Sequence, residues 1–224
     1  MVLVDGSPGS REVLEKPASL LSPRFHVIVP DLPGFGASTR DLPDYSFRAH
    51  GEYLLELLDA LHIDRAQFVG FSTGGGVVLS IADFAPQRVA SLVMLSAIGI
   101  QEYELAGNYC VNHVLHGPQL GALWLLKNCF PHFGLFRGRL LRSNTPETST
   151  IPPAPLAFHS GEPSRPMLII HGTRDRNVLI AAALEHHRMV SQSEIFEFDE
   201  NHFMAFMHPA EFLDPLERFL DGVR

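Results

Sequence analysis

The most informative segment of this 224-residue chain is Phe68-Val69-Gly70-Phe71-Ser72-Thr73-Gly74-Gly75-Gly76-Val77-Val78-Leu79. A short apolar run leads into Gly-Phe-Ser-Thr-Gly, and a glycine-rich helical pattern follows at once. This is the G-x-S-x-G pattern between a strand and a helix, where a sharp turn lifts the serine above the end of a sheet. Side chains at Gly70 and Gly74 would collide with such a turn. The context therefore favours a nucleophile elbow at Ser72 over a chance match.

Composition sets the outer limits of the fold. A length of 224 residues fits a single α/β domain over residues 1–224 better than two domains. Hydrophobic residues make up 46% of the chain and charged residues 19%, which permits a sizeable core. The net charge is −8 and no basic run exceeds two residues, which argues against nucleic acid as a partner.

Segments that would direct the chain to a membrane or an oxidising compartment are not apparent. Cys110 and Cys129 form neither a disulfide framework nor a metal-binding spacing. The first residues lack the basic and long apolar regions of a signal peptide. The most apolar stretch, Val89 to Ile100, is too short to span a bilayer. We therefore expect a cytoplasmic protein with no membrane span.

Short apolar runs that end in turn residues predict six strands: Val2–Val4, His26–Val29, Ala66–Val69, Ser91–Leu95, Met167–Ile170 and Ile195–Phe198. Helical periodicity predicts helices between them: Arg11–Leu21 interrupted by Pro17, Ser46–Leu61 with Ser46 as N-cap, Thr73–Phe84, Leu179–Val190 and Pro209–Leu220. Such alternation indicates an α/β fold with a doubly wound, mostly parallel sheet. Ligands of such sheets bind at the carboxyl ends of the strands.

Residues 98–165 break this alternation. Their first part is helical in pattern and contains Trp124, Phe130, Phe133 and Phe136, whereas the second part is rich in proline. A segment of this length without regular structure is unusual in a compact domain and indicates either a lid or a missing part of the fold. We interpret it as a cap insert. Its aromatic residues would either line an apolar acyl or alcohol pocket or form ordinary core.

A serine nucleophile requires a general base and an orienting carboxylate, which follow it in the order acid, then histidine. Asp175 and His202 each come just after a predicted strand, so both emerge at the same sheet edge as Ser72. These three are the candidate catalytic residues. Asp175 has an alternative role as the N-cap of a segment starting near Val178. Asp199 is the competing acid, which we expect to stay solvated.

The other histidines suggest no further centre. We expect His171 to pack at a strand terminus, and His186, His187 and His208 to lie on helix surfaces or at helix starts. No H-E-x-x-H pattern is present, so we expect neither a metal nor a cofactor.

Acyl transfer also requires backbone N–H groups directed at the developing oxyanion. One is expected from Thr73, which follows the nucleophile and begins a helix whose dipole favours negative charge. Ser7, in the loop after the first strand, is the expected source of the other. Gly6 and Gly9 permit a close backbone approach there, and would equally suit a tight turn.

Taken together, these motifs resemble the α/β-hydrolase fold superfamily, in its branch of capped serine esterases and lipase-like enzymes. The motifs in family order are Asp5–Ser10, Val29–Ser38, the elbow Gly70–Gly74, His171–Asp175 and Asn201–Phe203, which span nearly the whole chain. The resemblance implies Ser72 as nucleophile, Asp175 as acid, His202 as base, and the insert as a cap over the pocket.

The chain departs from this family pattern in three ways. Asp5-Gly6 stands where the family usually has His-Gly, and a carboxylate there would oppose the oxyanion unless it points away or stays protonated. The family's usual first two strands are missing, which would expose an apolar edge at His26–Val29 and allow a homo-oligomer to form through it. The helical cap is also shortened after Leu141.

The expected activity is hydrolysis of an apolar carboxylic ester through an acyl-enzyme intermediate. A serine at the elbow argues against epoxide hydrolysis and dehalogenation, which use aspartate there. Hydrolysis of C–C bonds, aminopeptidase activity and perhydrolysis use the same residues and stay open. The alternative from another class is a non-catalytic or impaired member that binds a small molecule, as the departures suggest.

Overall fold

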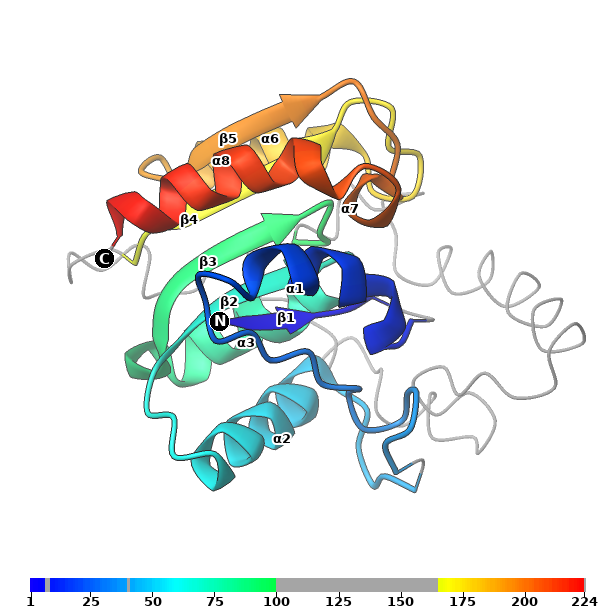
Figure 1. The fold of residues 1–224 in the computed structure, drawn as a ribbon, viewed down its shortest axis with the longest axis vertical. Helices are drawn as coiled ribbons and strands as arrows, with labels where there is room; N and C mark the ends of the chain where they lie inside the picture. The colour runs from blue at the N-terminus through cyan, green and yellow to red at the C-terminus, as the bar shows by residue number, and fades with distance from the viewer. Residues whose placement is uncertain (7–8, 40, 100–164, 224) are drawn as a thin grey trace, which may run out of the picture.

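A five-stranded parallel sheet forms the centre of the molecule (Figure 1). The computed structural model describes residues 1–6, 9–39, 41–99 and 165–223. The strands run in the order β1-β2-β3-β4-β5: β1 Val2–Val4, β2 Ala66–Phe71, β3 Val89–Leu95, β4 Met167–Gly172 and β5 Glu194–Phe198. Every pair is parallel, which confirms the predicted α/β class.

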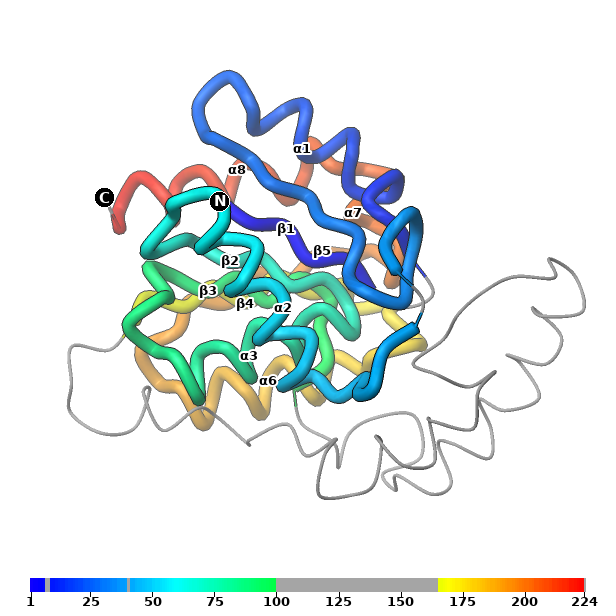
Figure 2. The backbone as a smooth tube through the Cα atoms, turned by 90° about the horizontal axis from the view of Figure 1, so that it is seen from below, coloured from blue at the N-terminus to red at the C-terminus, as the bar shows by residue number. Residues whose placement is uncertain are grey.

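Helices cover both faces of this sheet (Figure 2). On one face lie α2 Phe47–Ala60, α3 Gly74–Phe84 and α6 Ile180–Met189. On the other lie α1 Glu15–Leu21, α7 Met204–Met207 and α8 Pro209–Gly222. Two short 3₁₀ helices, η1 Arg11–Leu14 and η2 Pro86–Arg88, complete the described elements.

Side-chain alternation along the strands produces two cores. In β3, Leu92 and Met94 pack in the cluster under α2 and α3, whereas Val93 and Leu95 pack in the cluster under α1 and α8. Successive strand residues point to opposite faces, and both faces are covered. The central strands β3 and β4 are therefore almost continuously apolar, whereas the edge strand β5 exposes Glu194 and Glu197.

The observed starts of helices α2 and α1 bear on two predictions, the N-cap at Ser46 and the interruption at Pro17. The predicted N-cap is confirmed, because Ser46 Oγ accepts a hydrogen bond from the Ala49 N–H at 3.1 Å. The prediction that Pro17 interrupts a helix is wrong. Helix α1 begins at Glu15, which places Pro17 in its first turn, where the missing N–H would have no helical partner in any case.

The segment His26–Val29 does not form the predicted sixth strand. Ile28 alone bridges Val2: its N–H donates to the Met1 carbonyl and its carbonyl accepts from the Leu3 N–H, both at 2.9 Å. The next donor in a parallel ladder would be residue 30, which is Pro30 and has no N–H. At this edge of the sheet Ile28 is half-buried against the core, and the predicted association between copies stays a prediction.

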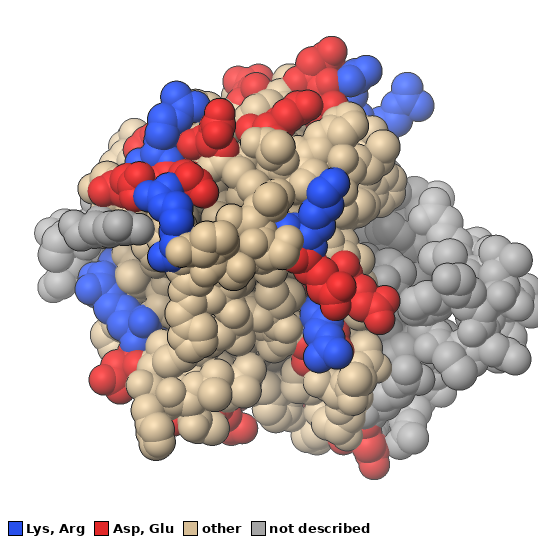
Figure 3. Space-filling view, in the orientation of Figure 1, with Lys and Arg blue, Asp and Glu red and all other residues tan. Residues whose placement is uncertain are grey.

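The surface of the described residues carries charges of both signs. On the face in Figure 3, acidic and basic side chains are interspersed rather than gathered by sign. No helix in the described residues is long and apolar enough to cross a membrane. The predicted cap insert, with Trp124, Phe130, Phe133 and Phe136, lies outside the described residues apart from its two ends.

Candidate active site

Ser72, Asp175 and His202 converge at one edge of the sheet. Ser72 follows β2, Asp175 follows β4, and His202 follows β5. Because all the strands are parallel, their carboxyl ends and the loops after them meet on the same side. Residues separated by up to 130 positions in the chain thereby come into contact.

The elbow holds Ser72 in an unusual backbone conformation. Its φ of 52° lies in the left-handed region, which is costly for any residue other than glycine. Three hydrogen bonds fix it there: the Ser72 N–H donates to the Leu95 carbonyl, and the Ser72 carbonyl accepts from the N–H groups of Gly75 and Ile98, at 3.0 to 3.2 Å. The surrounding structure therefore imposes the strain that exposes the hydroxyl to its partners.

The flanking glycines are needed for two different close approaches. A Cβ at Gly70 would lie 2.7 Å from the Gly74 carbonyl oxygen and the Gly75 Cα, within the elbow itself. A Cβ at Gly74 would instead run into the carbonyl oxygens of Val4 and Asp5, at the end of β1. The expectation that both glycines relieve the turn is thus right for Gly70, whereas Gly74 lets α3 approach the neighbouring strand.

A continuous hydrogen-bonded relay links the three candidate residues. His202 Nε2 lies 3.0 Å from Ser72 Oγ, and His202 Nδ1 lies 2.7 Å from Asp175 Oδ2. An ionised carboxylate only accepts hydrogen bonds, so Nδ1 carries the proton and Nε2 is left to accept the serine O–H. All three side chains are buried, with 4% to 8% of each residue exposed. The arrangement is competent to remove the proton from Ser72.

Asp175 has a second set of partners on its other oxygen. Oδ1 accepts from the N–H groups of Asn177 and Val178, at 2.8 and 2.9 Å. The alternative role predicted for Asp175 was an N-cap, but α6 begins only at Ile180 and Asp175 closes the preceding loop instead. The carboxylate thus orders its own loop and contacts His202 at the same time.

His171 reinforces this loop from behind. Its Nε2 donates to the Val178 carbonyl at 2.9 Å and lies 3.6 Å from Asp175 Oδ2. Burial lowers the pKa of His171, which favours the neutral form of the ring. The sequence placed His171 at a strand terminus, which is correct, but its contact with the loop of Asp175 was missed. The four-residue spacing to Asp175 is the signal that could have suggested it.

Asp199, the competing acid, lies away from this relay. Its side chain is 84% exposed and forms a 3.0 Å ion pair with Arg174. The expectation that Asp199 stays solvated is confirmed.

One histidine prediction is wrong. His186 does not lie on a helix surface but is 3% exposed, and burial lowers its pKa to about 4. It faces Gly99, where a Cβ would come within 2.8 Å of its Nδ1, so the missing side chain at residue 99 makes the space for the ring. His208, in contrast, starts α8 as predicted, and His187 is half-buried with Nδ1 2.8 Å from Ser193 Oγ.

One group of described residues places potential metal ligands together, namely Glu200, His208 and Glu211. It lies on the surface, and His208 Nδ1 is already paired with Glu200 at 2.7 Å. His208 and Glu211 are exposed and Glu200 is half-buried, with its carbonyl accepting a hydrogen bond from the Arg174 N–H at 2.9 Å.

Aromatic rings enclose the histidine of the relay. The rings of Phe71 and Phe203 lie 5.1 and 5.6 Å from that of His202, and Phe206 packs edge-on against Phe71. They limit the approach of water to the imidazole, which strengthens its hydrogen bonds. Phe203 is itself 47% exposed and forms part of the outer surface beside the site.

The oxyanion side of the site is built from β1 and the start of α3. A Cβ at Gly6 would lie 2.6 Å from Ser72 Cβ and 3.2 Å from Ser72 Oγ, so only glycine permits the loop to pass over the serine. Thr73 directly precedes α3, and none of the described residues accepts a hydrogen bond from its N–H. The other predicted donor, Ser7, lies outside the described residues.

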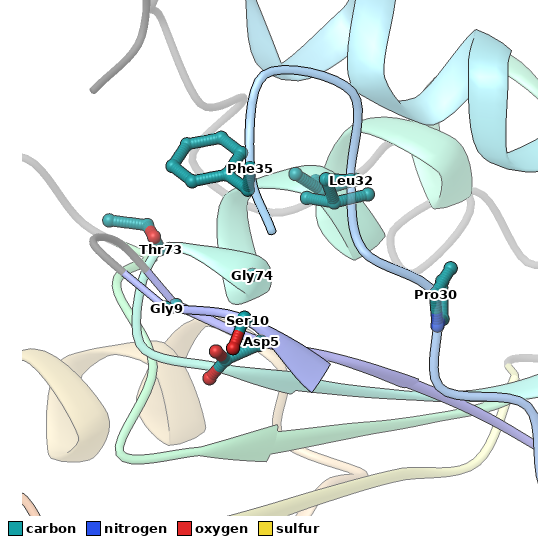
Figure 4. A pocket seen from close by; sticks show the side chains of 10 residues that line it. Asp5, Gly9, Ser10, Pro30, Leu32, Phe35, Thr73 and Gly74 are labelled. Carbon is teal, nitrogen blue, oxygen red and sulfur yellow. The ribbon is translucent and has the colours of Figure 1, made fainter. Parts of the chain in front are cut away.

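A shallow pocket that is partly open to solvent, with a cavity volume of about 10 Å³, adjoins these residues (Figure 4). Its walls are mainly apolar and come from the loop after the Ile28 bridge and from α3: Pro30, Leu32, Phe35, Thr73, Gly74 and Val77. Asp5, Gly6, Gly9 and Ser10 close the remaining side. The sequence indicated a fixed surface loop at Asp31–Ser38 but not that Leu32 and Phe35 would be buried there beside the elbow.

Known proteins place this chain among hydrolases. Residues 1–143 match the family model described as alpha/beta hydrolase fold. An uncharacterized protein of Mycobacterium tuberculosis is 31% identical over 240 residues, which cover 90% of this chain and 69% of that protein. A 2-hydroxymuconate semialdehyde hydrolase of Pseudomonas putida is 27% identical over 221 residues, covering 87% and 76% respectively.

The fold is also found among solved structures. A membrane phospholipase A, described as a bacterial virulence factor, superposes with a TM-score of 0.79 at 20% identity, covering 100% of this chain and 78% of that one. At this level of identity the likeness concerns the fold alone.

Proposed function

The chain belongs to the α/β-hydrolase fold family, and on that premise we propose that it is a serine hydrolase that cleaves a carboxylic ester through an acyl-enzyme intermediate. The observation that carries the proposal is the relay of Asp175, His202 and Ser72, with contacts of 2.7 and 3.0 Å. Three buried polar residues in this order supply a nucleophile, a base and the group that orients the base.

In the first half-reaction, His202 Nε2 removes the proton from Ser72 Oγ as Oγ attacks the ester carbonyl carbon. The carbonyl oxygen becomes an oxyanion, for which we propose the N–H groups of Thr73 and Ser7 as donors. The tetrahedral intermediate then collapses, the C–O bond to the alcohol breaks, and the imidazolium of His202 gives its proton to the leaving oxygen. Ser72 is left acylated.

In the second half-reaction, water takes the place of the alcohol. His202 Nε2 removes a proton from it, the hydroxyl attacks the acyl carbon, and the carboxylic acid leaves as Oγ regains its proton. Asp175 stays ionised throughout and stabilises the imidazolium. The adjoining apolar pocket favours a small apolar acyl or alcohol group, because Leu32 and Phe35 offer no polar side-chain atom.

A second candidate reaction is hydrolysis of a C–C bond. It is favoured by the similarity to the 2-hydroxymuconate semialdehyde hydrolase and would use the same three residues. Assays with a short p-nitrophenyl ester and with a ring-cleavage dienoic acid distinguish the two, because each candidate predicts a higher kcat/KM for its own substrate.

Ser72→Ala tests the proposal directly. We expect it to lower kcat for the ester by on the order of 10⁴ to 10⁶, because the residues act as a unit, and to abolish labelling by a fluorophosphonate probe. Ser91→Ala is the matched control: Ser91 is also buried, but it lies within β3 and its hydroxyl has no partner in the described structure. If folded wild-type protein is neither labelled nor active, the non-catalytic alternative holds.

A further inference from the structure

The carboxyl group of Asp5 lies inside the turn that passes over Ser72. Asp5 directly follows β1, and the next residue, Gly6, is the one whose missing side chain makes room for Ser72. The turn is closed by a 2.9 Å hydrogen bond from the Gly9 N–H to the Gly6 carbonyl. The space that a side chain at Gly9 would need is filled by the carboxyl of Asp5. The carboxyl of Asp5 is thus packed inside the turn that Asp5, Gly6 and Gly9 form beside Ser72.

This carboxyl lacks the partners that an ion would need. Its Oδ2 is buried and has no hydrogen-bond partner among the described residues, and it forms no ion pair with any of them. Among the described residues the Gly6 N–H donates to it, and the nearby carboxylate of Asp31 repels its ionised form. Asp5 as a whole is half-buried, but its Oδ2 is closed off from solvent, and with an unpaired inner oxygen and a like-charged neighbour the carboxylate is disfavoured relative to the neutral acid.

The start of α3 is a second favourable electrostatic feature beside Asp5, whose carbonyl oxygen would lie 2.7 Å from a Cβ at Gly74. Its partial positive charge would stabilise a carboxylate as well as an oxyanion, but such helix-terminus effects are smaller than the cost of burial. The balance is seen in the pKa of Asp5, which burial raises to about 7. Below that pH the neutral acid predominates, and above it the carboxylate predominates, with its inner oxygen unpaired among the described residues.

We propose that Asp5 is a positioning residue for the proposed ester hydrolysis: as a neutral acid it packs the turn of Gly6 and Gly9 over Ser72, and its ionisation inactivates the site. A carboxylate there has two adverse effects. Its charge opposes the negative charge that develops on the substrate carbonyl oxygen, and its need for hydration pulls the turn away from the serine. The aspartate at the position where the family usually has histidine therefore limits activity to the pH range in which it keeps its proton. This inference rests on the proposed function.

Asp5→Asn is the decisive variant, because asparagine matches the shape of the neutral acid and cannot ionise. We compare kcat/KM for a p-nitrophenyl ester between pH 5.5 and 9.5 in the full chain. The wild type should lose about tenfold per pH unit above pH 7, as expected for one inhibitory ionisation, and the variant should not. Half of Asp5 is already ionised at a pH equal to a pKa of about 7, so the ratio of variant to wild type should rise about 50-fold between pH 7 and pH 9.

Asp31→Asn provides a second arm that leaves Asp5 in place. Removing the repelling charge of Asp31 lowers the pKa of Asp5, so the alkaline loss of activity should begin at a lower pH than in the wild type. Asp31 accepts the Arg11 N–H on Oδ1 at 2.8 Å and the Ala37 N–H on Oδ2 at 3.0 Å, so asparagine, with its single oxygen, keeps one of these two hydrogen bonds.

A urea unfolding series provides a readout besides activity. Because folding raises the pKa of this carboxyl, its neutral form is preferred in the folded state, and the wild type should lose stability as pH rises from about 4 to 7. In Asp5→Asn this loss should be absent, so the difference between the two urea midpoints should grow over that range.

These outcomes separate the two proposals. If the wild type and Asp5→Asn hydrolyse the ester and lose activity alike above pH 7, the proposed role of Asp5 is wrong while the proposed function stands. If neither is active nor labelled by a fluorophosphonate, the proposed function fails, and with it the role of Asp5. Should Asp5→Asn fail to fold, an unchanged limb in Asp31→Asn overturns the role of Asp5, and a shift to lower pH supports it.

Discussion

The two sides of the candidate site are built very differently. On the base side, both ring nitrogens of His202 and both carboxylate oxygens of Asp175 have partners at 2.7 to 3.0 Å. On the oxyanion side, Asp5 keeps one buried oxygen without a partner among the described residues, and the Thr73 N–H is likewise unused there. On the base side every polar side-chain atom of His202 and Asp175 has a hydrogen-bond partner. On the oxyanion side the residues instead depend on close packing, which the missing side chains of Gly6 and Gly9 permit.

The difference follows from what each side has to do. A base works when its orientation and tautomer are fixed in advance, which requires complete hydrogen bonding. An oxyanion site works when its donors are free to meet a charge that exists only during the reaction. We therefore expect substitutions on the base side to lower activity by breaking hydrogen bonds. Substitutions on the oxyanion side should lower it by filling space that the turn needs or by adding a negative charge.

The largest effect in this comparison is expected from Asp175→Asn. An amide donates as well as accepts, so it can select the wrong tautomer of His202 and leave Nε2 protonated and unable to act as a base. We expect kcat to fall by on the order of 10⁴, as such a change of tautomer does in serine proteases. Asp199→Asn is the matched control, since its exposed carboxylate lies outside the relay. Equal activity of the two variants would remove Asp175 from the proposed mechanism.

A smaller loss is expected on the oxyanion side from Gly6→Ala. The added Cβ would stand 2.6 Å from Ser72 Cβ, so the turn must move away and carry its proposed donor with it. Removing one such donor costs about 10²- to 10³-fold in kcat. Gly222→Ala is the control, because nothing lies within 4 Å of a Cβ there. Steady-state kinetics should show the loss in Gly6→Ala alone, and an active variant would contradict a close role for this turn.

Much of the base side was predictable because it depends on topology. Apolar runs revealed the strands, and parallel strands bring the residues after their carboxyl ends together however far apart they are in sequence. That argument placed Ser72, Asp175 and His202 at one edge, where they are in hydrogen-bond contact. Their catalytic roles stay predictions. Helix ends were likewise readable from local chemistry, as the cap formed by Ser46 shows.

What could not be predicted depends on packing between distant residues. The sequence suggested a strand at His26–Val29, but only the register with β1 shows that the ladder needs an N–H that Pro30 lacks. His186 looked like a surface residue because its burial depends on the space left by Gly99, which lies 87 positions earlier in the chain. The packing of Asp5 against Gly9 spans only four positions, but it depends on the shape of the turn and no periodic pattern records it.

The smallest effect on kcat is expected from replacing His171, which supports the base side of the site indirectly. Its Nε2 holds the Val178 carbonyl, while the Val178 N–H holds Asp175 Oδ1, so removing the donor loosens one end of the loop that carries the acid. We expect His171→Phe to lower kcat about tenfold with KM unchanged, because a displaced acid affects the transition state more than substrate binding. His171→Gln, which retains an N–H donor, should recover most of the loss. Because both variants disturb the same buried position, a general loss of stability would lower both alike, whereas recovery in the glutamine variant alone identifies the hydrogen bond as the contribution of His171.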